Sequence, residues 1–76
     1  MVVAYVMVKA ASGDADRIRE AIADLDGVTE AHIVAGDMDF VVKVDVPEPG
    51  DVKRVAADEI QDIPGVEDTR TYIAMS

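Results

Sequence analysis

The stretch Ile22-Ala-Asp-Leu-Asp-Gly-Val28 returns 38 residues later as Ile60-Gln-Asp-Ile-Pro-Gly-Val66. Both copies keep an isoleucine, an aspartate and a glycine-valine pair at the same spacing, and a valine-rich run precedes each. Each copy therefore predicts a strand, a helix, a glycine turn and a second strand. Two such units in 76 residues predict one β-α-β-β-α-β domain, the ferredoxin-like α+β sandwich. Its four-stranded antiparallel sheet would carry both helices on one face.

The apolar runs predict where the four strands lie and what the sheet packs against. We expect strands at Val2–Ala10, Val28–Ala35, Phe40–Val46 and Val66 to about Met75. The first strand is apolar on both faces, whereas helices cover only one side of a two-layer domain. The surplus apolar face predicts a homodimer in which a second copy covers it. This face comprises Val3, Tyr5, Met7 and Val41.

Two amphipathic helices fill the segments between these strands. The first is predicted at about Asp14–Asp26, with Ser12 or Asp14 as its N-cap. The second is expected to begin with Asp51 as its cap and to stop at Pro64. Apolar residues recur at helical spacing in both, so each helix has one side for the sheet. The two stripes are Ile18, Ala21, Ile22 and Leu25, and Val52, Val55, Ala56, Ile60 and Ile63.

Composition limits the functions that this chain can have. Sixteen acidic against seven basic side chains give a net charge of −9, and the bases form no run, so direct nucleic-acid binding is not expected. A high-salt host and an ordinary acidic domain explain this charge equally well. There is no cysteine, and neither a metal nor a cofactor is predicted. Without a signal peptide or an apolar run of about 20 residues, we expect a cytoplasmic protein with no membrane contact.

The turn Gly36-Asp37-Met38-Asp39 is the best candidate for a ligand site. Free turn amides can bind a carboxylate, Asp37 or Asp39 can hold an ammonium group, and Met38 can cover an apolar side chain. One turn would thus hold both ends of an α-amino acid. The same residues are also typical of ordinary hairpin turns, in which Asp39 would only hold the turn in place.

Three other polar residues are weaker candidates for a site. Thr69 and Thr71 place two hydroxyls on one face of the last strand, although the strand preference of threonine explains them as well. His32 is the only histidine, so it lacks a second metal ligand and an evident orienting partner. The sequence therefore predicts no catalytic set and no metal site.

In order and spacing, these motifs resemble the effector-binding (RAM) domain of the Lrp/AsnC, or feast/famine, transcriptional regulators. The resemblance rests on a Gly-x-x-Asp turn at Gly36 followed by an apolar strand, and on Ile63-Pro-Gly-Val before Thr69-x-Thr71. It covers essentially the whole chain, residues 1–76, as a single domain. Two features depart from the family pattern: no helix-turn-helix DNA-binding domain is present, and Met38 stands where the family often has an aromatic residue.

The resemblance implies a non-catalytic regulatory module that binds an amino-acid effector and modulates Lrp/AsnC-type regulators. It further implies dimers built on sheet faces, rings of dimers, and full-length family regulators as partners. The effector would lie near Gly36, Asp37, Met38 and Asp39, with Thr69 and Thr71 contributed by a neighbouring subunit. Two alternatives share the β-α-β-β-α-β order: an ACT-like amino-acid-binding domain, and a small dimeric enzyme of the cofactor-free monooxygenase or isomerase type. The sequence offers such an enzyme few residues for substrate binding and catalysis, because it has one histidine and few aromatic residues.

Overall fold

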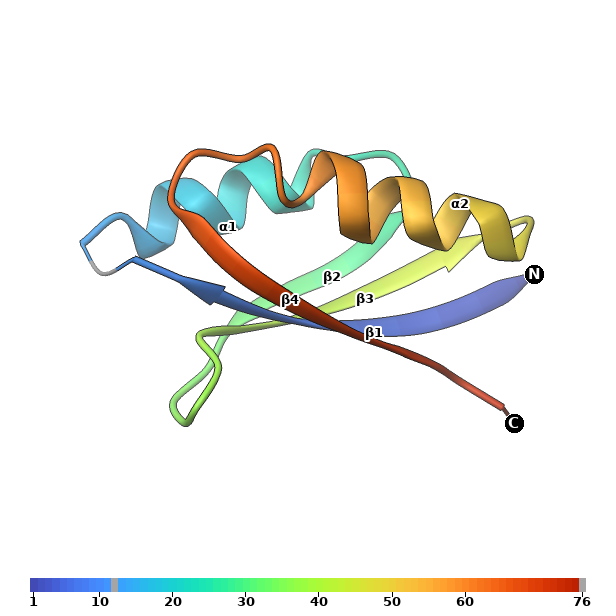
Figure 1. Cartoon of the computed structure of the whole chain (residues 1–76), viewed down its shortest axis with the longest axis horizontal. Helices are drawn as coiled ribbons and strands as arrows, with labels where there is room; N and C mark the ends of the chain where they lie inside the picture. The colour runs from blue at the N-terminus through green and yellow to red at the C-terminus, as the bar shows by residue number, and fades with distance from the viewer. Residues whose placement is uncertain (12, 76) are drawn as a thin grey trace.

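The predicted ferredoxin-like architecture is confirmed by the computed structural model, which describes residues 1–11 and 13–75. The strands are β1 (Val2–Ala10), β2 (Val28–Ile33), β3 (Phe40–Val46) and β4 (Val66–Ile73). They form one antiparallel sheet in the order β2-β3-β1-β4. Both helical segments lie on the same side of this sheet, and its other face, called here the outer face, is left bare (Figure 1).

The first helix, α1 (Ala15–Ala23), is shorter than predicted. Asp14 occupies the N-cap position without a side-chain capping bond, and the alternative cap, Ser12, lies outside the described residues. The helix ends early because the amide of Leu25 bonds to the carbonyl of Ile22, three residues back, which tightens the last turn.

The second helix begins earlier than predicted, and it changes from an α-helix to a π-helix along its length. α2 (Pro49–Lys53) starts with a proline, which suits the first helical position because its missing N–H would have no partner there. From Arg54 to Glu59 the chain continues as a π-helical segment, η1, in which the amide of Ile60 reaches the carbonyl of Val55 at 2.9 Å. The predicted cap, Asp51, thus lies inside the helix.

The 38-residue repeat is also present in the hydrogen bonds. After each helix the chain makes the same three backbone bonds before entering the next strand, with nearly equal N···O distances. Gly27 and Gly65 then both adopt a positive φ, of 97° and 102°. The paired bonds are Asp24 to Glu20 and Asp62 to Asp58, Leu25 to Ile22 and Ile63 to Ile60, and Val28 to Leu25 and Val66 to Ile63.

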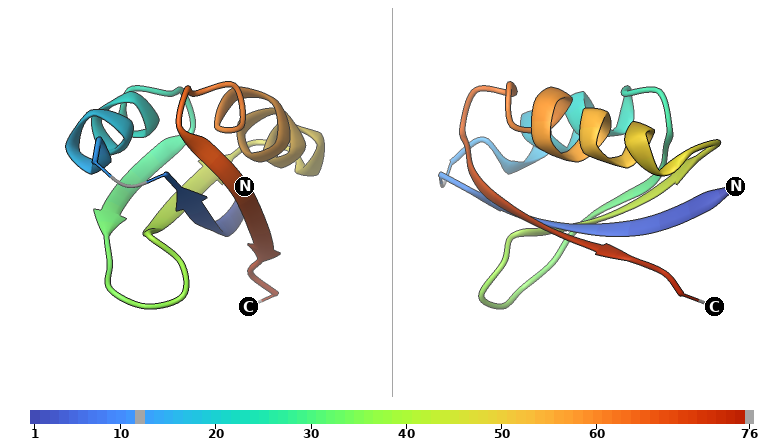
Figure 2. Two further views of the ribbon diagram at one scale, coloured as in Figure 1. Left: turned by 60° about the vertical axis from the view of Figure 1, so that its left-hand side comes forward. Right: turned by 45° about the vertical axis from the view of Figure 1, so that its right-hand side comes forward.

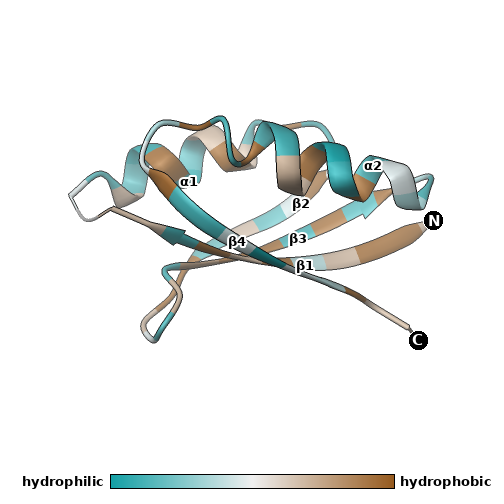
Figure 3. Cartoon of the chain, in the orientation of Figure 1, coloured by the Kyte–Doolittle hydropathy of each residue, from teal (hydrophilic) through white to brown (hydrophobic). Residues whose placement is uncertain are grey.

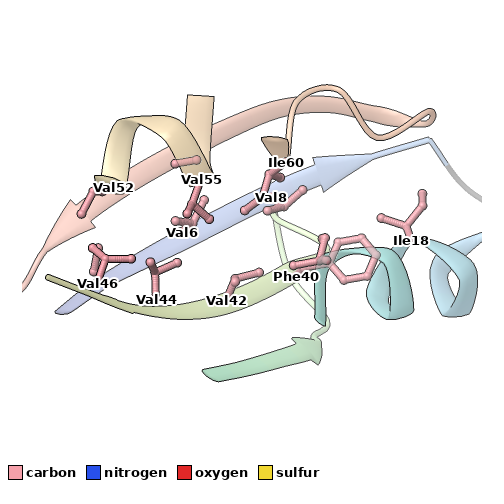
Figure 4. Packing of buried hydrophobic residues seen from close by; sticks show 13 residues of the cluster. Val6, Val8, Ile18, Phe40, Val42, Val44, Val46, Val52, Val55 and Ile60 are labelled. Carbon is pink, nitrogen blue, oxygen red and sulfur yellow. The ribbon is translucent and has the colours of Figure 1, made fainter. Parts of the chain in front are cut away.

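The core lies between the sheet and the helices (Figure 4). Every second residue of β1 and β3 points into it, and antiparallel pairing places these residues opposite one another. The helices turn hydrophilic residues away from the sheet (Figure 3), and no described helix is long and apolar enough to cross a membrane. The buried side chains are Ala4, Val6, Val8, Ile18, Ile22, Phe40, Val42, Val44, Val46, Val52, Val55, Ala56 and Ile60.

Candidate ligand-binding site

The loop between β2 and β3 extends beyond the sheet on the side away from the helices (Figure 2). β2 ends at Ile33, two residues before its predicted end, and the loop closes through a 2.9 Å bond from the amide of Val34 to the carbonyl of Asp39. Gly36 and Asp37 are exposed and Met38 is half-buried. The tip of the loop is therefore available to a ligand.

Asp39 takes part in three hydrogen bonds, two with β1 and one with Val34, which follows β2. Its Oδ2 atom accepts the amide of Ala10 at 2.9 Å, and its own amide donates to the carbonyl of Val8 at 2.9 Å. The third is the bond with Val34. These contacts favour the role of a turn anchor for Asp39, and leave Asp37 as the free carboxylate of the loop.

Replacing Asp39 by alanine should therefore lower stability. The substitution leaves the half-buried amide of Ala10 without its charged acceptor, so we expect the free energy of unfolding to fall by about 1.5–3 kcal/mol. Urea denaturation with Asp37→Ala as the matched control measures this effect. An Asp39→Ala protein as stable as wild type, with ligand affinity lost, would instead assign the carboxylate to the ligand.

Asp37 and Met38 line a hollow of about 360 Å³ on the outer face. Its floor comes from β1 and β4, on which Lys9 lies opposite Asp68 and Met7 opposite Arg70. The hollow thus brings two cations, two carboxylates and apolar side chains together. Its lining residues are Met7, Lys9, Asp37, Met38, Asp68, Arg70 and Tyr72.

Thr69 and Thr71 share a face of β4, as predicted, but this face turns toward the helices. Thr69 pairs with Val8 and Thr71 with Val6, both core residues. The hydroxyl of Thr69 accepts a 2.8 Å hydrogen bond from Nε2 of Gln61, a residue that no sequence motif singled out.

Thr71 borders a second hollow of about 330 Å³ between β4 and the second helix. Its lining is mainly apolar, with one lysine, and comprises Pro49, Val52, Lys53, Ala56, Ala57, Thr71 and Ile73. A single chain therefore does not bring the threonines to its own loop, and only a neighbouring subunit could do so.

His32 has a partner that the sequence did not reveal. Its Nε2 lies 3.0 Å from Oε1 of Glu30, whose other oxygen is 3.8 Å from Nζ of Lys43. The hydrogen bond with His32, and to a smaller extent the charge of Lys43, hold the pKa of Glu30 below its usual value. This cluster is exposed on the outer face, and within residues 1–11 and 13–75 no three histidine or acidic side chains gather to hold a metal.

The fold and the exposed, charged loop fit a small ligand-binding domain, and the comparison with known families makes this specific. The chain belongs to the Lrp/AsnC family, because the model of the Lrp/AsnC ligand binding domain matches residues 3–76. The leucine-responsive regulatory protein of Klebsiella pneumoniae is 33% identical over 60 residues, 79% of this chain. The chain spans only 37% of the length of that relative.

Solved structures give the same result. TTHA0845 from Thermus thermophilus superposes with a TM-score of 0.94 at 30% identity, over 100% of this chain and 95% of the other. AsnC of Escherichia coli superposes with a TM-score of 0.89 at 25% identity, over 99% of this chain and 51% of that protein. The family is one of regulatory ligand-binding domains, which favours the predicted regulator over the ACT-like and enzymatic alternatives.

Proposed function

We propose that this domain binds an amino acid, assembles with itself, and modulates transcription regulators of the Lrp/AsnC type in the cytoplasm. The match of residues 3–76 to the ligand binding domain of that family carries the proposal. Relatives named for their response to leucine support an amino-acid effector. The role is regulatory and non-catalytic.

The loop supplies groups suited to an amino acid. The backbone amides of Gly36 and Asp37, both exposed residues, can bind a carboxylate, and the carboxylate of Asp37 can bind an ammonium group. Met38 is flexible enough to adapt to an apolar side chain. We propose that Thr69 and Thr71 of a neighbouring subunit complete this site, since those of the same chain face the helices.

Self-assembly would bury the outer face of the sheet. Tyr5 is 39% exposed there, and Tyr72, its cross-strand neighbour, is 55% exposed. A 76-residue domain buries only about 60% of its unfolded surface, so a second copy would add a substantial share of the buried apolar area. We propose a face-to-face dimer, and rings of such dimers as the larger assembly.

A thermal-shift screen against the twenty amino acids, with light scattering on the same samples, tests this function. We expect one or a few amino acids to raise the melting temperature, because a ligand that binds only the folded state stabilises it. The same ligands should change the mass of the assembly. A melting temperature that no amino acid raises at millimolar concentration would refute the proposed effector class.

The 76-residue chain should not bind DNA directly. Its net charge of −9 repels the phosphate backbone, and the basic residues are scattered. We expect no change in fluorescence anisotropy of a labelled random duplex at low salt, the most permissive condition, up to tens of micromolar protein. Micromolar binding there would show that the domain has a nucleic-acid surface of its own.

A further inference from the structure

The hollow of about 330 Å³ between β4 and the second helix, called here the helix-side hollow, lies apart from the outer face. The helix residues that line it recur at spacings of three and four, so they form one stripe along the helix. Thr71 and Ile73 close the other side and lie on the helix side of the sheet, because they pair with the core residues Val6 and Ala4. A face-to-face dimer on the outer face would therefore leave this hollow open.

The 38-residue repeat shows why the hollow forms beside this helix. Ala56 and Ala57 correspond to Ile18 and Arg19 of the first copy, so two large side chains are replaced by methyl groups. Both alanines line the helix-side hollow. The equivalent place in the first copy holds only about 100 Å³. The fold as such does not require the hollow, which belongs to the second half of the chain alone.

Two polar groups at this hollow lack partners. Lys53 is the one charged residue among those that line it, and within residues 1–11 and 13–75 it forms no ion pair within 4.0 Å. The adjacent Arg54, in contrast, is held by the carboxylates of Asp51 and Glu59. Thr71 also has a free hydroxyl, because no described side chain bonds to it.

An apolar hollow with one free cation and one free hydroxyl matches an apolar chain that ends in an anion. The ammonium of Lys53 can pair with a carboxylate, and the hydroxyl of Thr71 can donate to the same group. No acidic side chain is among the lining residues, so an ammonium group would find no partner here. The volume lies at the small end of the range of roughly 300–1,000 Å³ for ligand pockets, which favours a short chain.

We propose that the helix-side hollow binds a short aliphatic monocarboxylate. Lys53 and Thr71 hold its carboxylate, and the apolar wall contacts its hydrocarbon chain. The inference goes beyond the proposed function and does not depend on it, because the ligand is no amino acid and the site is not the β2–β3 loop. The wall comprises Pro49, Val52, Ala56, Ala57 and Ile73.

Titration with sodium hexanoate, followed through the amide chemical shifts in NMR spectra, tests both the place and the chemistry. A salt concentration of about 0.15 M screens the net charge of −9. We expect saturating shifts at Lys53, Ala57 and Thr71. Hexanamide has the same chain without a charge and should bind about three- to tenfold more weakly. Each methylene added between butanoate and hexanoate should tighten binding about two- to fourfold.

Two variants separate the cation from the wall. Lys53→Met should no longer prefer hexanoate over hexanamide. Ala57→Leu fills the hollow from an exposed helix position and should weaken both ligands about tenfold or more. Arg19→Met and Ala23→Leu on α1 are the matched controls, because they make the same kinds of change away from the hollow, and both should bind like wild type.

Several results would overturn the inference. Shifts confined to the outer face around Tyr5 and Tyr72 would mean that the acid only coats the exposed apolar sheet. A Lys53→Met protein that still prefers hexanoate would remove the carboxylate assignment, and unchanged binding by Ala57→Leu would remove the hollow. No shift at tens of millimolar hexanoate would reject the ligand class. The amino-acid screen tests the proposed function separately, so that function stands or falls without these results.

Discussion

Replacing Tyr5 by glutamate is expected to convert the proposed dimer into a folded monomer. Tyr5 lies at the centre of the outer face, between Lys43 of β3 and Tyr72 of β4. In the monomer a new carboxylate there would meet water and Lys43, so the fold should survive. In the dimer it would be buried without a partner, at a cost of about 3–5 kcal/mol. The dissociation constant of the dimer should rise by roughly two to three and a half powers of ten, because each 1.4 kcal/mol corresponds to a factor of ten.

Sedimentation velocity over a range of concentrations, with circular dichroism to check the fold, gives the measurement. Ala23→Glu is the matched control, because it places the same charge on an exposed site of α1, on the opposite side of the sheet. Its dimer should match wild type. Wild-type protein that sediments as a folded monomer at micromolar concentration would reject the outer face as an interface, and so would an undiminished Tyr5→Glu dimer.

The topology could be predicted because local and long-range signals in the sequence agree. The repeated glycine-valine pair sets the chain reversals after both helices, and alternation along β3 separates core from surface residues. The segment Arg54–Glu59 could not be predicted to this detail. Its buried residues, Val55 and Ala56 followed by Ile60, fit the spacing of an α-helix, and only the bond from Ile60 to Val55 shows the wider turn.

The candidate site was predictable only in part, because a site depends on which strands are neighbours. The loop at Gly36 stands out from its composition alone. The side of the sheet on which Thr69 lies follows from its pairing with Val8 between β4 and β1. The same register of β1 and β4 brings Lys9 and Arg70 to one hollow. No local pattern contains that pairing. The contact of His32 with Glu30 could have been predicted from the sequence, because residues two apart on a strand lie on the same face.

The second large effect is expected at the repeated glycines, Gly27 and Gly65. The sequence repeat makes the two positions look equivalent, whereas the structure shows that an added side chain would meet different neighbours at each. A Cβ atom at Gly27 would lie 2.8 Å from Cγ1 of Val46, a buried side chain whose branching at Cβ leaves it little freedom. The positive φ adds strain for any other residue, about 1–3 kcal/mol, and overpacking a further 1–3 kcal/mol. Gly27→Ala should thus lower the free energy of unfolding by about 2–6 kcal/mol, out of a total of roughly 4–11 kcal/mol for a domain of this size.

Gly65→Ala should cost less than Gly27→Ala, because its Cβ would meet Cδ1 of Ile18 at 2.9 Å, the far end of a side chain that can rotate aside. Gly13→Ala is the matched control: its φ is 108°, yet nothing lies within 4 Å of the added carbon, so it reports backbone strain alone. Urea denaturation should order the losses as Gly27, then Gly65, then Gly13. Equal losses at all three positions would mean that backbone strain alone sets the cost and that the core adjusts to the extra carbon. A larger loss at Gly65 than at Gly27 would contradict the tight packing of Gly27 against Val46.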